Sequence, residues 1–206
     1  MKIITISREF GSGGRELGKR MADELGFDYY DKEIITAIAS HSGMDENYVD
    51  WALDQHGWQN VPLTFRNSFS SVSIQTAQTG LLLEQKRVIE DIAKAGKDCI
   101  IVGRNADVLL RDYHPFNLFV CADIDARVHR CMDRAPEGED LTAKEMERKI
   151  RNIDKSRAHT RDIISSSRWG ERTAYHLTVN TTDWNIKELT PVVSAFVKCW
   201  FDREIK

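Results

Sequence analysis

The fold is decided by residues 3–18, which carry the sequence Ile3-Ile4-Thr5-Ile6-Ser7-Arg8-Glu9-Phe10-Gly11-Ser12-Gly13-Gly14-Arg15-Glu16-Leu17-Gly18. A short apolar run leads into a glycine-rich turn, and apolar side chains then recur at helical spacing at Leu17, Met21 and Leu25. Strand, turn and helix in this order place the first N–H groups of the helix, and the positive end of its dipole, against the turn. We therefore predict that the turn binds an anion, and that this anion is a nucleotide phosphate.

Six residues of the turn form the candidate phosphate site: Gly11, Ser12, Gly13, Gly14, Arg15 and Glu16. Glycine accepts positive φ and lets a backbone approach a ligand closely. In a full Walker A motif, G-x-x-x-x-G-K-[ST], the lysine reaches the β- and γ-phosphates and the hydroxyl holds Mg²⁺. Aligned on Gly13, this turn has Gly14 at the lysine position, and neither Arg15 nor Glu16, which follow it, carries the hydroxyl. We predict Arg15 as the substitute cation and Glu16 as a Mg²⁺ ligand, directly or through water.

Two other interpretations of the turn stay open. It can be a glycine-rich connection without a ligand, or an incomplete dinucleotide motif, G-x-G-x-x-G, with Glu16 at the position of the third glycine. In the second case Asp28 or Asp31 would bind a ribose, and the protein would be a nicotinamide-dependent oxidoreductase.

The bulk composition indicates a single globular domain. The chain has 206 residues, with 29 Lys and Arg against 32 Asp and Glu. The resulting net charge of -3 does not indicate a protein that binds a nucleic-acid polymer, because such proteins carry an excess of positive charge. The four cysteines are widely spaced, without the pairs or histidine clusters of a zinc or redox site. No apolar run is long enough to span a bilayer and no secretory leader is recognisable, so we expect a cytoplasmic protein without membrane contact.

Strand patterns alternate with helical patterns along the chain. Strands are expected at residues 3–6, 27–30, 99–102, 117–121 and 176–179, and the main helices at residues 14–25, 81–95, 123–134, 142–159 and 185–200. This alternation predicts a parallel sheet covered by helices on both faces, with ligands at the carboxyl ends of the strands. The side chains expected to face the core include Ile124, Val128, Met132 and Phe196.

The helix expected at residues 142–159 carries a row of charged side chains. They are Arg148, Arg151, Asp154, Arg157 and, one turn further, Arg161. Arginines of a closing lid can stabilise the charge of a phosphoryl group in transfer while they displace water. A solvated helix face with internal ion pairs is the alternative, and the predicted phosphate site favours the lid.

Two further segments suggest a second substrate. Arg104 and Asp107 follow the strand at residues 99–102, where an arginine can bind an acceptor phosphate and an aspartate can accept from a base amine or a sugar hydroxyl. An ordinary salt bridge is the alternative for this pair. Residues 59–80 carry a single charge, Arg66, and no clean period, so they form either a substrate-covering insertion or the contact of a homodimer.

Four motifs together resemble the cytidylate kinase-like family. They are Ile4-Thr5-Ile6-Ser7-Arg8-Glu9-Phe10-Gly11-Ser12-Gly13-Gly14-Arg15-Glu16, Tyr30-Asp31-Lys32-Glu33, Val102-Gly103-Arg104-Asn105-Ala106-Asp107 and Asp154-Lys155-Ser156-Arg157-Ala158. The resemblance runs from residue 3 to about residue 183. Two positions depart from cytidylate kinases, because the Walker lysine is absent and Val102 stands where an acidic residue usually precedes the Gly-Arg pair.

The resemblance implies an α/β fold of three α/β/α layers with a five-stranded parallel sheet, similar to P-loop nucleoside monophosphate kinases, and a helical lid. Residues 1–206 would form one kinase-like domain, with residues 31–80 as an acceptor-covering helical insertion and residues 136–172 as the lid. Its implied activity is transfer of the γ-phosphoryl group of ATP, with Mg²⁺, to CMP or dCMP. A kinase of another small acceptor and a non-catalytic nucleotide-binding or regulatory module are the alternatives.

The same resemblance implies roles for individual residues. Residues 11–16 would hold the donor phosphates, Arg104 the acceptor phosphate, and Arg157 with Arg161 the transferring group, while Arg151 and Asp154 would orient the lid. Together with the residues argued from the sequence itself, the catalytic candidates are Arg15, Arg157 and Arg161, and the acceptor-binding candidates are Asp31, Arg104, Asp107, Arg151 and Asp154. Small-molecule nucleotides are therefore the expected partners.

Overall fold

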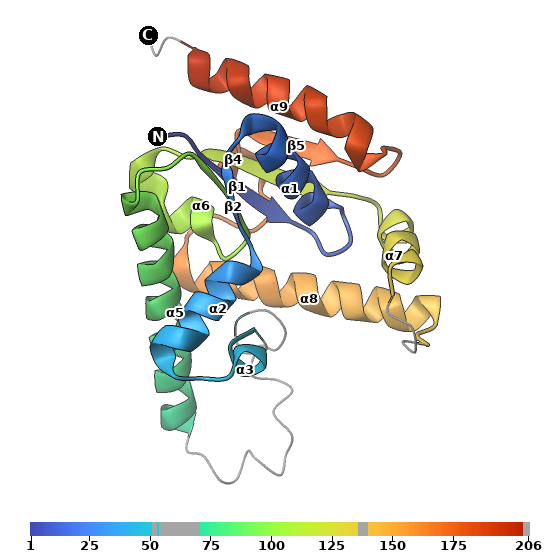
Figure 1. The fold of residues 1–206 in the computed structure, drawn as a ribbon. Coiled ribbons are helices and arrows are strands. Elements are labelled where there is room, and N and C mark those ends of the chain that lie inside the picture. The colour runs from blue at the N-terminus through green and yellow to red at the C-terminus, as the bar shows by residue number, and fades with distance from the viewer. Residues whose placement is uncertain (51–52, 54–70, 136–139, 204–206) are drawn as a thin grey trace.

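The computed structural model describes residues 1–50, 53, 71–135 and 140–203, and it shows a five-stranded parallel sheet in the order β2-β3-β1-β4-β5 (Figure 1). In chain order the strands are Ile3–Arg8 (β1), Asp28–Tyr30 (β2), Cys99–Val102 (β3), Phe116–Cys121 (β4) and Leu177–Asn180 (β5). The predicted fold class is confirmed.

Helices lie on both faces of this sheet. They are Gly14–Leu25 (α1), Lys32–Ser42 (α2), Glu46–Asp50 (α3), Ser71–Lys94 (α5), Ala106–Leu109 (α6), Ile124–Asp133 (α7), Ala143–Ile164 (α8) and Ile186–Asp202 (α9), with 3-10 turns at Arg111–Tyr113 and Arg172–Ala174. Figure 1 shows α1 and α9 together on one side of the sheet and α2 and α5 on the other. The long helix α8 packs against α7.

Two buried clusters explain why β1 is buried throughout and why its first two residues are both apolar. Ile4 and Ile6 pack into the cluster shared with α1 and α9, whereas Ile3 packs into the cluster shared with α2 and α5. Alternate residues of a strand point to opposite faces, so a strand covered on both faces needs apolar side chains in succession.

Local sequence signals agree with several helix ends. Gly26 closes α1 with a φ of 71°, and Thr142 and Glu145, which have the spacing of a capping box, form one at the start of α8. Asp31 precedes α2 at the position of a capping residue, but its side chain makes no capping bond and pairs with arginines instead.

Other expectations are corrected by the packing. Helix α5 begins at Ser71, ten residues before its expected start, so only residues 54–70 of the insertion, with 51–52, lie outside the described chain. Residues 136–139 of the predicted lid lie outside it as well. Met132 and Phe196 are 42% and 46% exposed rather than facing the core, and on α7 the buried residue is Arg127.

The strand order brings three strand ends together. β1 is central, with β3 and β4 paired to its two sides, so the chain leaving β1 emerges between the carboxyl ends of both neighbours. This edge of the sheet is where a ligand binds in open parallel sheets.

Among the described residues, none of the helices combines the length and the apolar character that a membrane span requires.

Candidate active site

The turn between β1 and α1, residues 9–13, is here called the glycine loop. Gly11 and Gly13 have φ values of 80° and 83°. A Cβ on Gly11 would lie 2.8 Å from Cys131 Sγ, and one on Gly13 would lie 2.6 Å from Ile186 Cδ1. Both positions therefore require glycine for conformation and for space.

The amino end of α1 borders a large cavity at the glycine loop, which is described below. Leu17 N–H donates to the Gly13 carbonyl at 2.9 Å, as the first bond of the helix. The N–H groups that precede it have no partner within a helix, and they lie at the positive end of the helix dipole. This arrangement suits a phosphate.

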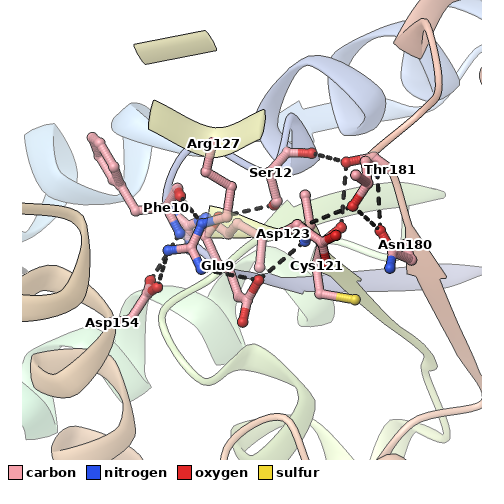
Figure 2. Close-up of polar contacts among 12 residues, drawn as sticks. Glu9, Phe10, Ser12, Cys121, Asp123, Arg127, Asp154, Asn180 and Thr181 are labelled. Carbon is pink, nitrogen blue, oxygen red and sulfur yellow. Dashed lines mark hydrogen bonds and ion pairs between the residues drawn. The ribbon is translucent and has the colours of Figure 1, made fainter. Parts of the chain in front are cut away.

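The glycine loop is bonded to the ends of β4 and β5 (Figure 2). Glu9 N–H donates to the Val120 carbonyl at 2.9 Å, and the Glu9 carboxylate accepts from Ala122 N–H at 3.1 Å. Thr181 Oγ1, just after β5, donates to the Ser12 carbonyl at 2.6 Å. Ser12 itself is fully buried behind the loop.

A ring of three residues, here called the loop clasp, fixes the centre of the glycine loop. Phe10 N–H donates to Asp154 Oδ1 at 2.8 Å, and the Phe10 carbonyl accepts from Arg127 Nε at 2.8 Å. Arg127 and Asp154 are themselves paired, and Arg127 also lies 3.1 Å from Glu9 Oε2 (Figure 2). The clasp thus joins the loop to α7 and α8.

Arg127 was missed by the sequence analysis, which placed Ile124 and Val128 on the inner face of its helix. The signal was present, because residue 127 lies three positions after 124 and therefore on that same face. The apolar periodicity hid an arginine whose side chain is 7% exposed.

A cavity of about 1000 Å³ opens at the glycine loop. Nine cationic side chains line it against five acidic ones. The cationic residues are Arg8, Arg15, Lys19, Arg20, Lys32, Arg130, Arg134, Lys149 and Arg157. Its volume lies at the upper end of the range for small-molecule sites, and its charge favours a polyanion.

Several predicted phosphate ligands line this cavity, but two of them are paired with other side chains. The Arg15 side chain, 55% exposed, contacts Asp31 with Nε 2.5 Å from Oδ2. Glu16 accepts from Arg20 at 2.9 Å and from Arg134 at 2.6 Å. Partial burial would raise the pKa of Glu16, but these two hydrogen bonds outweigh it and the pKa is lowered.

The described residues contain no preformed metal site built from protein side chains alone. No group of three His, Cys, Asp or Glu within them could ligate a metal, and the Glu16 carboxylate is held by arginines. Glu16 as a magnesium ligand stays a prediction that requires these ion pairs to open. Mg²⁺ can still accompany ATP through the phosphate oxygens of the substrate.

Arg157 lies between the large cavity and a second one. Its Nη1 donates to the Arg8 carbonyl at 2.9 Å, and its side chain is 12% exposed. Arg157 also lines a small cavity of about 30 Å³ at the end of β3, which Arg104 lines as well. Arg104 has a φ of 59°, and its carbonyl accepts from the buried Gln85 Nε2 at 3.0 Å.

The remaining predicted residues lie away from both cavities. Arg161 is 2% exposed, and its Nη1 donates to Asp107 Oδ2 at 2.6 Å, while Nε donates to the Ser167 carbonyl at 3.1 Å. Arg151 pairs with Glu147 one turn away on the exposed face of α8. The four candidate residues of the lid therefore have different surroundings. Arg151 lies in an exposed ion pair and Asp154 in the loop clasp. Arg157 lines both cavities, and Arg161 lies in a buried ion pair.

Comparison with known proteins agrees with this geometry. The model of the cytidylate kinase-like family matches residues 3–183. The chain belongs to the cytidylate kinase-like family. No curated protein sequence matches the chain.

Solved structures share the fold of this family member at low identity. A structure of an uncharacterized protein from Eubacterium ventriosum has a TM-score of 0.70 at 21% identity, covering 96% of this chain and 99% of that one. Shikimate kinase from Bacteroides thetaiotaomicron has a TM-score of 0.57 at 13% identity, covering 96% and 98%. Shikimate kinase from Acinetobacter baumannii in complex with shikimate has a TM-score of 0.57 at 14% identity, covering 98% and 96%. Family and fold together support a P-loop kinase.

Proposed function

We propose that this protein transfers the γ-phosphoryl group of ATP to a nucleoside monophosphate, with CMP and dCMP as the first candidates. One observation carries the proposal: Arg157 lines both the cavity at the glycine loop and the small cavity at Arg104. A phosphoryl group that passes between two bound substrates needs a cation at their junction.

The donor side is supported by backbone and charge together. Helical N–H groups at the start of α1 face the cavity, and the cationic side chains around it would surround a triphosphate. Because the loop clasp fixes the glycine loop before any ligand binds, these donors need little rearrangement to meet developing charge.

The acceptor side is supported by the family and by two predicted residues. Asp31 and Arg104 follow β2 and β3, at the same edge of the sheet as the glycine loop. The shikimate-bound kinase of this fold acts on a smaller acceptor, so a kinase of another small acceptor is the alternative within the same chemistry.

A non-catalytic nucleotide-binding module is favoured by one observation, the glycine at the position of the Walker lysine. It predicts that ATP raises the thermal unfolding midpoint, since a ligand bound only to the folded state stabilises it. It also predicts no turnover with any acceptor.

The test is coupled ADP release with a panel of nucleoside monophosphates and shikimate. We expect turnover with CMP or dCMP, and a fall in kcat of about 100-fold in Arg157→Ala with a smaller change in the dissociation constant of ATP, because the arginine meets charge in the transition state. Arg111→Ala is the matched control, since the Arg111 side chain is 81% exposed. ATP binding without turnover on any acceptor would contradict the proposal.

A further inference from the structure

Two glycines make room for the side chain of Arg8, the last residue of β1. A Cβ on Gly14 would lie 2.6 Å from Arg8 Cβ, and a Cβ on Gly103 would lie 1.6 Å from Arg8 Nη1. Gly14 begins α1 and Gly103 follows β3, so both neighbours of this arginine leave their side-chain space to it.

The missing lysine and the presence of Arg8 are therefore one structural feature. Gly14 occupies the position where a Walker motif has lysine. Any side chain at residue 14 would overlap Arg8, since 2.6 Å is well inside van der Waals contact of two carbons. Because the overlap begins at the Arg8 Cβ, a lysine at residue 14 would require glycine at residue 8 in this backbone.

Arg8 is also placed where the lysine would act. It is 6% exposed and lines both the large and the small cavity. Its Nη2 lies 3.8 Å from Asp31 Oδ1, and its own carbonyl holds the cavity arginine, Arg157, at 2.9 Å. The Arg15 side chain, in contrast, is 55% exposed, although it also contacts Asp31.

We propose that Arg8, rather than Arg15, is the cation that contacts the β- and γ-phosphates of the donor in place of the Walker lysine. The inference rests on the proposed function. In the transfer, an oxygen of the acceptor phosphate forms a bond to the γ-phosphorus, and the bond to the β–γ bridging oxygen breaks, leaving its electron pair on ADP. Arg8 keeps its proton throughout and stabilises the charge on the transferring oxygens.

The experiment exchanges the two cations. Arg8→Ala, Arg15→Ala, Gly14→Lys and the double variant Arg8→Gly/Gly14→Lys are compared by kcat and by the affinities for ADP and for a non-hydrolysable ATP analogue. We expect Arg8→Ala to lower kcat about 100-fold and to reduce the preference for triphosphate over diphosphate about tenfold. Its loss should exceed that of Arg15→Ala. The double variant should exceed Gly14→Lys at least tenfold in kcat, because removing Arg8 makes room for the lysine.

Each outcome decides between explanations. A triphosphate preference within threefold of the unsubstituted protein in Arg8→Ala, or a larger loss in Arg15→Ala, overturns the inference. If Arg8→Ala does not fold, a double variant no better than Gly14→Lys overturns it equally. If the unsubstituted protein turns over no acceptor, the proposed function fails, whereas the triphosphate preference still tests Arg8 by itself.

Discussion

The glycine loop after β1 and the turn at residues 103–105 after β3 lie at adjacent strand ends but are built differently. Side chains or backbone from β4, α7, α8 and the end of β5 bond the glycine loop. The turn has three successive positive φ values, 77°, 59° and 52°, and Gln85 of α5 bonds its middle carbonyl. The loop borders about 1000 Å³ of space and the turn about 30 Å³.

This difference teaches that the two proposed substrate sides, the donor side at the glycine loop and the acceptor side at the turn, are organised to different degrees. The donor side is open and fixed by several elements, so ATP is expected to bind without an acceptor. The turn holds two non-glycine residues, Arg104 and Asn105, in the left-handed region, which costs roughly 1 kcal/mol or more for each. Such strain is often kept at functional sites, so we expect acceptor binding to change this turn.

The largest expected effect is on stability and concerns the buried ion pair of Arg161 and Asp107. Arg161→Ala should lower the free energy of unfolding by about 3–5 kcal/mol, because it leaves the Asp107 carboxylate buried without its cation. Urea unfolding measures this. If Arg161→Ala instead has the stability of the unsubstituted protein and a lower kcat, Arg161 acts in catalysis rather than in stabilising the fold.

The loop clasp gives the next prediction. Arg127→Ala should lower the free energy of unfolding by about 3 kcal/mol and weaken ATP binding, because Asp154 and Glu9 lose the cation between them and the Phe10 carbonyl loses its donor. The exposed Arg111→Ala should stay within about 0.5 kcal/mol of the unsubstituted protein. Unchanged ATP affinity in Arg127→Ala would show that the donor side is not organised by the clasp.

The turn after β3 can be tested with paired glycine variants. Gly103→Ala and Gly96→Ala both place alanine at φ near 75°, but only the first meets Arg8, since nothing lies within 4 Å of a Cβ on Gly96. Gly96→Ala should therefore lose roughly 1 kcal/mol of stability, and Gly103→Ala about 1–2 kcal/mol more. Thermal and urea unfolding compare the two. Equal losses would mean that Arg8 moves aside without penalty.

The smallest expected effect is the pH dependence of stability that His176 contributes, at a position outside both cavities. Partial burial against Phe116 and Trp200, with the nearby Arg203, lowers the pKa of His176 from its ordinary 6.5. Its Nδ1 also accepts from Asn117 N–H at 2.9 Å, which needs an unprotonated nitrogen.

As pH falls below 6.5, the unfolded chain therefore binds this proton more readily than the folded one, and stability decreases. Urea midpoints at pH 7 and pH 5 should show a smaller decrease in His176→Gln than in the unsubstituted protein. An equal or larger decrease in the variant would contradict this assignment.

The sequence was sufficient for features that depend on neighbouring residues. The strand-turn-helix order at residues 3–25, the capping box at Thr142 and the alternation of strands and helices all follow from local spacing. The contacts of Arg8 and Arg127 could not be predicted, because they depend on residues far along the chain. Phe10 lies 117 residues from Arg127, and Gly103 meets Arg8 across two neighbouring strands.

The predicted lid shows the same limit. Helical spacing placed its arginines near one face, but the pairing of each is set by what packs against it. Arg157 reaches the end of β1, while Arg161 reaches Asp107 in the core. A charge pattern therefore predicted the helix and its proximity to the site, and the contacts separated the cavity residue from the buried one.

The most direct test is a crystal structure with Mg²⁺ and a non-hydrolysable ATP analogue. We predict that its β- and γ-phosphates lie at the N–H groups that begin α1, with the guanidinium groups of Arg8 and Arg157 toward the γ-phosphate. A nucleotide bound elsewhere, with the cavity at the glycine loop filled by side chains, would contradict the account.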